Sequence, residues 1–310
     1  MQIPPDRGHI STEQRPAEHE SPLDMLPTAD IVRLIVDDQQ GAVEAVSARA
    51  SIIAAFVDGL VERMRSGGRL IYLGAGTSGR LGVLDASECP PTFGADPQQI
   101  VGIIAGGDAA LRRSSEATED DPDGAAAQLD DLNIKETDTV LGIAAGGTTP
   151  WVLGGLAEAS RRDAATALLT CSPRECPPGC DQLLLIDTGP ELVTGSTRLK
   201  AGTATKATLN AITTAAFIRL GTVHGDLMVN IRSTNDKLLD RAIRILLTYQ
   251  PEMARGDAVA LLESCHGHLK TAIVSARHGL APQAAGSLID QCHGSLRQAL
   301  GAAAAGLSQR

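Results

Sequence analysis

The chain has 310 residues, of which 43% are hydrophobic and only 2% aromatic, and its formal net charge is −10. This length is enough for one large domain with a small appendage, whose core must be filled by aliphatic residues and alanine. The sequence contains no run of Lys or Arg, which excludes an extended nucleic-acid-binding surface. An anionic ligand would have to be bound by local backbone N–H groups and helix ends.

The cysteine spacing and the N-terminal composition both bear on the cellular compartment. Cys171, Cys176 and Cys180 match neither a zinc-binding nor a thioredoxin spacing, so we expect free thiols and no metal. The first 21 residues are polar and lack the apolar segment of a signal peptide. The uncharged stretch 139–157 is interrupted by Gly146-Gly147 and Pro150, so it is not a membrane span. These features predict a soluble cytoplasmic protein.

The pattern of elements changes twice along the chain. Residues 1–26 are expected to form a polar N-terminal arm, and apolar residues at helical spacing predict helices at 29–47 and 50–65. Short apolar runs then alternate with helical segments (124–132 and 152–161), which predicts a parallel five-stranded sheet sandwiched by helices. The expected strands are 70–73, 100–105, 139–145, 165–171 and 183–186.

The remainder of the chain is predicted to be helical. A long helix is expected at 197–220, and an all-helical C-terminal subdomain should follow the α/β domain, which would span 27–234. The helices expected in the subdomain, 235–310, are 235–247, 258–265, 269–276, 281–287 and 291–300.

A glycine-rich loop, Gly74-Ala75-Gly76-Thr77-Ser78-Gly79, follows the first predicted strand and precedes a helix. It matches G-x-G-x-x-G, which makes a dinucleotide site one alternative. That motif expects an acidic residue about 20 positions later, at the end of the next strand. The strand expected at 100–105 ends in Gly106-Gly107-Asp108, well beyond that distance. The hydroxyls of Thr77 and Ser78 favour a phosphate monoester, and a simple tight turn is the third alternative.

A second loop repeats the arrangement after the strand expected at 139–145. It reads Gly146-Gly147-Thr148-Thr149-Pro150. Loops at the carboxyl ends of neighbouring parallel strands face one crevice, so the two loops are expected to bind a single ligand. Tight turns that simply need glycine remain the alternative.

Several carboxylates could act at such a crevice. Glu88 precedes Pro90 and Pro91, which are expected to end the helix there. Glu116 and Glu119 belong to an acidic cluster, for which a solvated helix end is the ordinary interpretation. Glu191 precedes the turn at 194–197, where Ser196 or Thr197 could cap the long helix, and Lys200 could balance a bound phosphate or face solvent.

Longer motifs make the sequence specific. The run from Leu73 to Gly94, which contains Ser87-Glu88-Cys89-Pro90-Pro91, resembles the N-acetylmuramic acid 6-phosphate etherases. So do the stretch from 102 to 107 and the stretch from Thr194 to Arg219, which begins Thr-Gly-Ser-Thr-Arg-Leu-Lys-Ala-Gly-Thr. The resemblance covers nearly the whole chain.

The resemblance implies a sugar isomerase (SIS) domain of flavodoxin-like type with a small helical C-terminal subdomain, in a homodimer without metal or cofactor. Members of the family eliminate D-lactate from C3 of their substrate after removal of the C2 proton, and water then adds to give N-acetylglucosamine 6-phosphate. By the family's motifs, Glu88 corresponds to the proton donor and Glu119 to the base. Residues expected to bind the sugar phosphate are Gly76, Thr77, Ser78, Gly79, Glu116, Thr148, Thr149, Glu191, Ser196, Thr197 and Lys200.

The second loop departs from the family pattern. The usual Ala-Ser-Gly-Arg-Thr-Pro-Tyr is replaced by a sequence without the serine, the arginine and the tyrosine, running from Ala145 to Trp151. Loss of one charge-assisted hydrogen bond would weaken binding by roughly 1.5–3 kcal/mol. A non-catalytic sugar-phosphate sensor, like the SIS-containing glucokinase regulatory protein, and an aldose–ketose isomerase are therefore the alternatives.

Overall fold

The structure is a computed structural model that describes residues 6–16, 21–113, 118–231 and 235–302. It divides into two compact units. Unit 1 comprises Met1–Ser87 and Pro97–Thr213, and unit 2 comprises Glu88–Asp96 and Thr214–Arg310. The fourth and seventh α-helices each contribute residues to both units.

Unit 1 is built on a five-stranded parallel sheet with strand order β2-β1-β3-β4-β5. The central strands are apolar and almost wholly buried, as expected for a sheet covered on both faces. The predicted parallel five-stranded sheet is confirmed. Its strands are β1 (Leu70–Gly74), β2 (Ile100–Ile104), β3 (Thr139–Ile143), β4 (Ala165–Thr170) and β5 (Gln182–Leu185).

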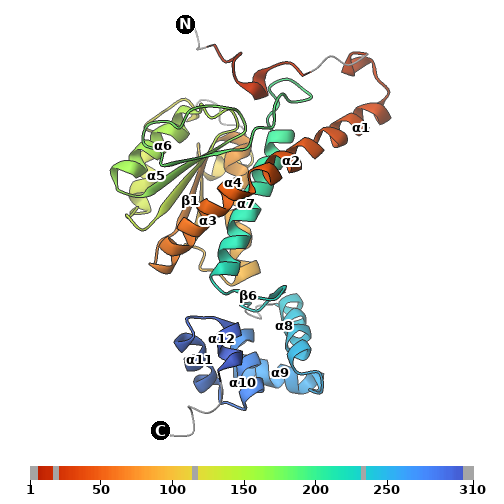
Figure 1. Cartoon of the computed structure of the whole chain (residues 1–310), viewed down its shortest axis with the longest axis vertical. Helices are drawn as coiled ribbons and strands as arrows, with labels where there is room; N and C mark the ends of the chain where they lie inside the picture. The colour runs from red at the N-terminus through yellow and green to blue at the C-terminus, as the bar shows by residue number, and fades with distance from the viewer. Residues whose placement is uncertain (1–5, 17–20, 114–117, 232–234, 303–310) are drawn as a thin grey trace. The chain divides into compact units, whose positions relative to one another are not determined.

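Helices cover both faces of this sheet. Figure 1 shows α5 and α6 on one face and α3, α4 and α7 on the other. Close packing needs glycine in the strands: a Cβ atom on Gly142 would lie 2.7 Å from a methyl carbon of Val152 on α6. The helices are α3 (Ala50–Arg65), α4 (Gly76–Phe93), α5 (Ala126–Asp131), α6 (Pro150–Arg161) and α7 (Lys200–Arg219), with a 3₁₀ turn, η3, at Asp108–Leu111.

The N-terminal segment differs from the expected polar arm and single helix. Ile10 is 3% exposed and Thr12 is fully buried, so part of this segment packs into unit 1. The expected helix 29–47 is broken at Gln39. The elements here are 3₁₀ turns η1 (Ser11–Glu13) and η2 (Leu23–Met25), then α1 (Thr28–Asp38) and α2 (Gln40–Ala48).

Two helix ends also differ from expectation. Pro90 and Pro91 do not end α4, which continues through both to Phe93. The long helix α7 begins at Lys200, three residues later than expected, because Glu191 caps it: the Glu191 carboxylate accepts the N–H groups of Lys200 (2.9 Å) and Ala201 (2.8 Å).

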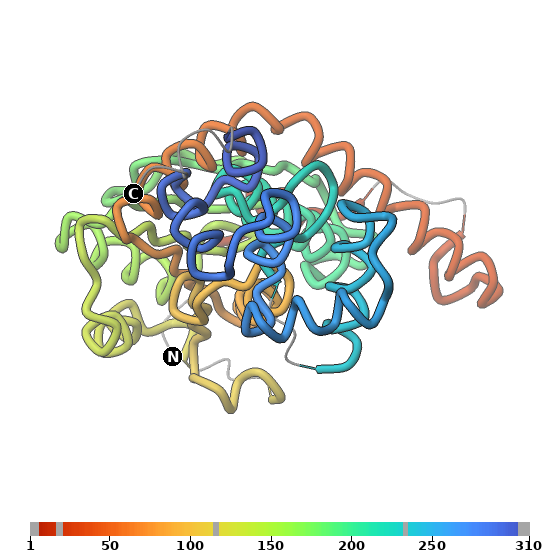
Figure 2. Tube along the Cα trace, turned by 90° about the horizontal axis from the view of Figure 1, so that it is seen from below, coloured from red at the N-terminus to blue at the C-terminus, as the bar shows by residue number. Residues whose placement is uncertain are grey.

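Unit 2 is predominantly helical, as predicted, with one short antiparallel hairpin that the sequence analysis missed. Its helices enclose an aliphatic core that includes Leu246, Leu262 and Ile273, and Figure 2 shows them as a group of short helices in shades of blue. The elements are β6 (Val223–His224), β7 (Leu227–Met228), α8 (Asp236–Tyr249), α9 (Arg255–Ser264), α10 (Leu269–His278), α11 (Pro282–Gln291) and α12 (Leu296–Gly301). No helix among the described residues is long and apolar enough to cross a membrane.

Candidate functional site

The first glycine loop forms a tight connection between β1 and α4. A Cβ atom on Gly79 would lie 2.6 Å from the carbonyl oxygen of Gly74, so the strand and helix can approach only through glycine. Gly76 has a φ of 52°, in the left-handed region that favours glycine. Thr77 and Ser78 stand half-buried in the first turn of α4, and their hydroxyls form no hydrogen bond with the described residues. This end of α4 therefore offers hydroxyls and backbone N–H groups to an anion.

Glu119 lies directly against this loop. A Cβ atom placed on Gly76 would be only 3.3 Å from Oε1 of Glu119. The Glu119 carbonyl accepts the backbone N–H of Trp151 at 3.1 Å, which ties the segment to the first turn of α6. The β1 and β3 strands are neighbours at the point where the strand order reverses, which is where ligands bind in open α/β sheets. Glu119 therefore joins the two predicted loops at the carboxyl ends of β1 and β3.

The second loop is a short turn between β3 and α6. Its Gly147 has a φ of 70° and donates its N–H to the carbonyl of Ala144 at 2.8 Å. Thr149 directly precedes α6, whose first residue is Pro150. The hydroxyl of Thr148 is buried and has no hydrogen-bond partner among the described residues. A buried hydroxyl without a partner costs free energy, so a bound ligand could satisfy it.

Two arginines that the sequence analysis did not single out lie over this second loop. A Cβ atom on Gly147 would lie 2.6 Å from Cδ and 3.3 Å from Nη1 of Arg174. A Cβ atom on Gly146 would lie 3.5 Å from Nη2 of Arg7. No local motif connects positions 7, 146 and 174, so only the folded chain reveals this arrangement.

The N-terminal segment is held at the same edge of the sheet. The backbone N–H of Thr12 donates to Oγ of Ser172, two residues after the end of β4, at 3.3 Å. The two hydroxyls of these residues are also 3.1 Å apart. The N–H of Gly195 donates to the carbonyl of Thr12 at 3.2 Å. Residues 10–13 thus form part of the carboxyl edge of the sheet, next to the second loop.

The residues predicted between 191 and 200 have mostly structural contacts. Glu191 is fully buried, and this burial raises the pKa of its carboxyl. Lys200 is 8% exposed, and its ammonium donates to Asp38 (2.7 Å) and to the carbonyl of Pro190 (2.8 Å). Ser196 and Thr197 lie in the turn before α7, and Thr77 approaches α7 at Gly202. Glu191 and Lys200 therefore position the start of α7.

Glu88 does not belong to this cluster, and Glu116 cannot be placed in it or outside it. Glu88 is exposed on α4, twelve residues or about three turns after Gly76, within the part of the helix that belongs to unit 2. Glu116 lies outside the described residues. The structure thus brings together Gly76–Gly79 and Glu119, and joins them through α6 to Thr148 and Thr149.

The described residues include no group of three or more His, Cys, Asp or Glu that could hold a metal ion. All six cysteines lie in the described part of the chain and are free thiols, as predicted. Burial raises the pKa of the Cys171 thiol to about 12, so this group stays protonated and is a poor nucleophile.

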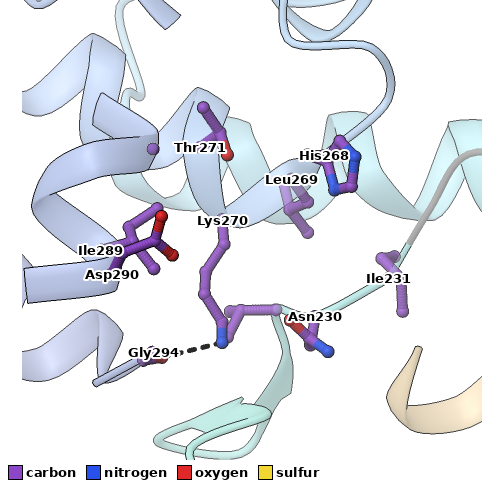
Figure 3. Close-up of a pocket in the computed structure, with 11 residues that line it drawn as sticks. Asn230, Ile231, His268, Leu269, Lys270, Thr271, Ile289, Asp290 and Gly294 are labelled. Atoms are coloured by element: carbon purple, nitrogen blue, oxygen red, sulfur yellow. Dashed lines mark hydrogen bonds between the residues drawn. The ribbon is translucent and has the colours of Figure 1, made fainter. Parts of the chain in front are cut away.

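A separate cavity of about 280 Å³ lies within unit 2. Figure 3 shows Lys270 extending across it, with its ammonium donating to the carbonyl of Gly294 at 2.8 Å. Asn230 lies beside the end of this side chain, and His268 and Asp290 also line the cavity. Burial lowers the pKa of Lys270 to about 8 because the charged ammonium loses hydration.

This lysine should make the stability of the protein depend on alkaline pH. Because its folded pKa of about 8 lies below the ordinary value of 10.5, the unfolded chain binds more protons between these pH values. The contribution of Lys270 to the free energy of unfolding should therefore rise from about pH 8 to about pH 10.5. Chemical denaturation across that range should show the rise in the wild type, and Lys270→Met should flatten it. If Lys270→Met showed the same rise as the wild type, the pH dependence of stability would not come from Lys270.

Comparisons with known proteins identify relatives of this chain. Residues 52–160 match the family model described as the glucokinase regulatory protein N-terminal SIS domain. An N-acetylmuramic acid 6-phosphate etherase of Synechococcus sp. (strain CC9605) is 49% identical over 92% of this chain and 90% of that protein. The one of Gloeobacter violaceus is 48% identical over 87% of this chain and 88% of its own length. Among solved structures, phosphoheptose isomerase from Neisseria gonorrhoeae aligns with a TM-score of 0.42 at 14% identity, covering 61% of this chain and 97% of that one.

Proposed function

This chain belongs to the N-acetylmuramic acid 6-phosphate etherase family, and from that membership we propose that it cleaves the D-lactyl ether of N-acetylmuramic acid 6-phosphate. The products are N-acetylglucosamine 6-phosphate and D-lactate, which makes the protein a carbon–oxygen lyase of amino-sugar recycling. The observation that carries the proposal beyond family membership is the position of Glu119, whose carboxylate lies against Gly76 at the carboxyl end of β1, the strand next to β3.

The reaction requires a base near the sugar ring. The C2 proton is α to the aldehyde of the open-chain sugar, so a carboxylate can remove it while the carbonyl stabilises the resulting charge. We assign this step to Glu119. The lactate oxygen then leaves from C3, taking a proton from a general acid, and a water molecule adds at C3 of the unsaturated aldehyde. The atoms balance with water as the only co-reactant.

The general acid is assigned to Glu88. This assignment rests on its motif, Ser87-Glu88-Cys89-Pro90-Pro91, and on its solvent-exposed position on α4. An exposed carboxyl can exchange protons with water between turnovers. Glu119 and Glu88 thus have different roles, which separate measurements can distinguish.

Substrate binding is assigned to the two glycine loops. At the start of α4, the hydroxyls of Thr77 and Ser78 can bind oxygen atoms of an anion or a sugar. At the second loop, the buried hydroxyl of Thr148 and the adjacent Thr149 offer further contacts. In this proposal Glu191 and Lys200 support the site by fixing the start of α7, and Glu116, Ser196 and Thr197 remain candidate sugar contacts.

The proposal includes a cytoplasmic homodimer. Apolar side chains on α1 and α2 are exposed, with Val32 at 54%, Val36 at 61% and Val43 at 61%. Contiguous exposed apolar residues are a feature of interaction surfaces, and a second copy would cover them. Sedimentation equilibrium should give twice the mass of the chain, and a monomer at micromolar concentration would contradict this part of the proposal.

The function is tested with the purified protein and N-acetylmuramic acid 6-phosphate. Release of D-lactate and N-acetylglucosamine 6-phosphate in equal amounts is the expected result. Binding of the sugar phosphate without lactate release would instead support the non-catalytic sensor. Conversion between aldose and ketose phosphates without lactate release would support the isomerase.

A further inference from the structure

The second loop contains no residue that could neutralise the charge of a bound phosphate. Its residues Gly146–Thr149 include no cation, whereas a phosphate monoester carries close to two negative charges at neutral pH. Backbone N–H groups and hydroxyls can bind its oxygens but leave this charge uncompensated. A cation must therefore come from another part of the chain or from solvent.

Arg174 is placed to supply that charge. It follows β4, the strand beside β3, and its side chain crosses Gly147 so closely that a Cβ atom there would lie 2.6 Å from its Cδ. Glycine at position 147 is thus what lets the guanidinium reach the turn. The side chain is anchored by one hydrogen bond, from Nε to the carbonyl of Glu175 at 3.0 Å.

The rest of this guanidinium is unusually short of partners. Its Nη1 is buried and has no hydrogen-bond partner among the described residues, and no ion pair to Arg174 is formed within them. Burying an unpaired charged donor costs free energy, so such groups in folded proteins are usually paired. The neighbouring Thr148 hydroxyl is also buried without a partner. Two donors of this kind, on adjacent loops, match the acceptor oxygens of an anion.

Arg7 is the other guanidinium near this loop, and it is less suited to the role. It is 55% exposed and already pairs with Glu13 at 3.4 Å. Solvent and the Glu13 carboxylate both weaken its interaction with an additional anion. The charge at the second loop is therefore carried chiefly by Arg174.

We propose that Arg174 binds the phosphate group of the substrate over the Gly146–Gly147 turn and makes this protein selective for phosphorylated sugars. The inference rests on the proposed function and adds to it a phosphate ligand from outside the two glycine loops. A guanidinium binds phosphate through two parallel N–H···O bonds, which also fixes the orientation of the sugar. Arg174 is thus a specificity-determining residue that takes no part in proton transfer.

The test uses Arg174→Met, which keeps the apolar stem over Gly147 but removes the charge, with Arg174→Lys as the conservative variant. Loss of a charge-assisted hydrogen bond predicts a KM for N-acetylmuramic acid 6-phosphate at least about tenfold higher in Arg174→Met, with kcat nearly unchanged. Arg174→Lys should recover part of the loss. The matched control is Arg161→Met, which removes the same charge from a side chain that is 67% exposed on α6.

A binding measurement separates this inference from the proposed function. Inorganic phosphate should raise the melting temperature of the wild type and of Arg161→Met, but not that of Arg174→Met. D-lactate should change the melting temperature of all three proteins equally. Because Nη1 has no partner, Arg174→Met without phosphate should melt no lower than the wild type. Unchanged phosphate stabilisation, or a variant that melts lower yet binds phosphate normally, would overturn the inference. A wild type that binds phosphate through Arg174 but releases no lactate would overturn only the etherase function.

Discussion

Replacing Glu119 with glutamine is expected to lower kcat for lactate release by a factor of about 100 to 10,000, with little change in KM. The carboxamide has nearly the same shape as the carboxylate but cannot accept the C2 proton. Oε1 of Glu119 lies within contact distance of the Gly76 position, so an isosteric change keeps the packing and removes only the base. Steady-state assays of D-lactate provide the measurement.

Deuterium exchange distinguishes the two carboxylates. In D₂O, Glu88→Gln should still remove the C2 proton while lactate leaves slowly, so substrate recovered from the reaction should gain deuterium at C2. Glu119→Gln should neither exchange nor eliminate. The control Glu44→Gln changes an exposed carboxylate on α2 and should behave as the wild type. Lactate release by Glu119→Gln within tenfold of the wild type would exclude Glu119 as the base.

Replacing Gly154 with alanine is expected to reduce both stability and activity. Gly154 lies inside α6, where a Cβ atom would stand 1.7 Å from the carbonyl oxygen of Pro122. That atom belongs to the backbone and cannot move alone, so the segment that carries Glu119 must shift. Overpacking of this kind costs typically 1–3 kcal/mol in the free energy of unfolding, and displacement of a catalytic group by about 1 Å can cost about 100-fold in rate.

The matched control for this change is Gly59→Ala on α3. Gly59 has nothing within 4 Å of its Cβ position. Alanine is there expected to stabilise the helix by roughly 0.5–1 kcal/mol, because glycine loses more backbone entropy on folding. Urea denaturation and the lactate assay would compare the two variants. A Gly154→Ala protein with wild-type stability and kcat would show that α6 and the Pro122 segment can separate without consequence.

Much of the molecule could be predicted from local sequence. Continuous apolar runs between helical segments predicted the parallel sheet, because strands buried on both faces cannot alternate polar and apolar residues. Each glycine loop directly follows one of these apolar runs, so both loops could be placed at strand ends. Long motifs such as the one around Glu88 identified the family, since a 22-residue match is far more specific than a lone glycine pattern.

Local signals failed at two helix ends and in the N-terminal segment. Pro90 and Pro91 are strong helix breakers, yet α4 continues through them to Phe93. The start of α7 was misplaced because its cap, Glu191, stands nine residues before Lys200, beyond the range of a local capping pattern. The polar composition of the first 26 residues likewise concealed the buried positions of Ile10 and Thr12.

The sequence by itself determined the fold class, the family and the position of the two glycine loops, because these depend on periodicity and on contiguous motifs. Only the tertiary structure decided which distant residues meet those loops. Glu119 reaches Gly76, and Arg174 lies over Gly147, through contacts between segments far apart in the chain. Strand order and loop packing set such contacts, and neither has a local signal. The cation absent from the second loop in sequence is therefore present beside it in space.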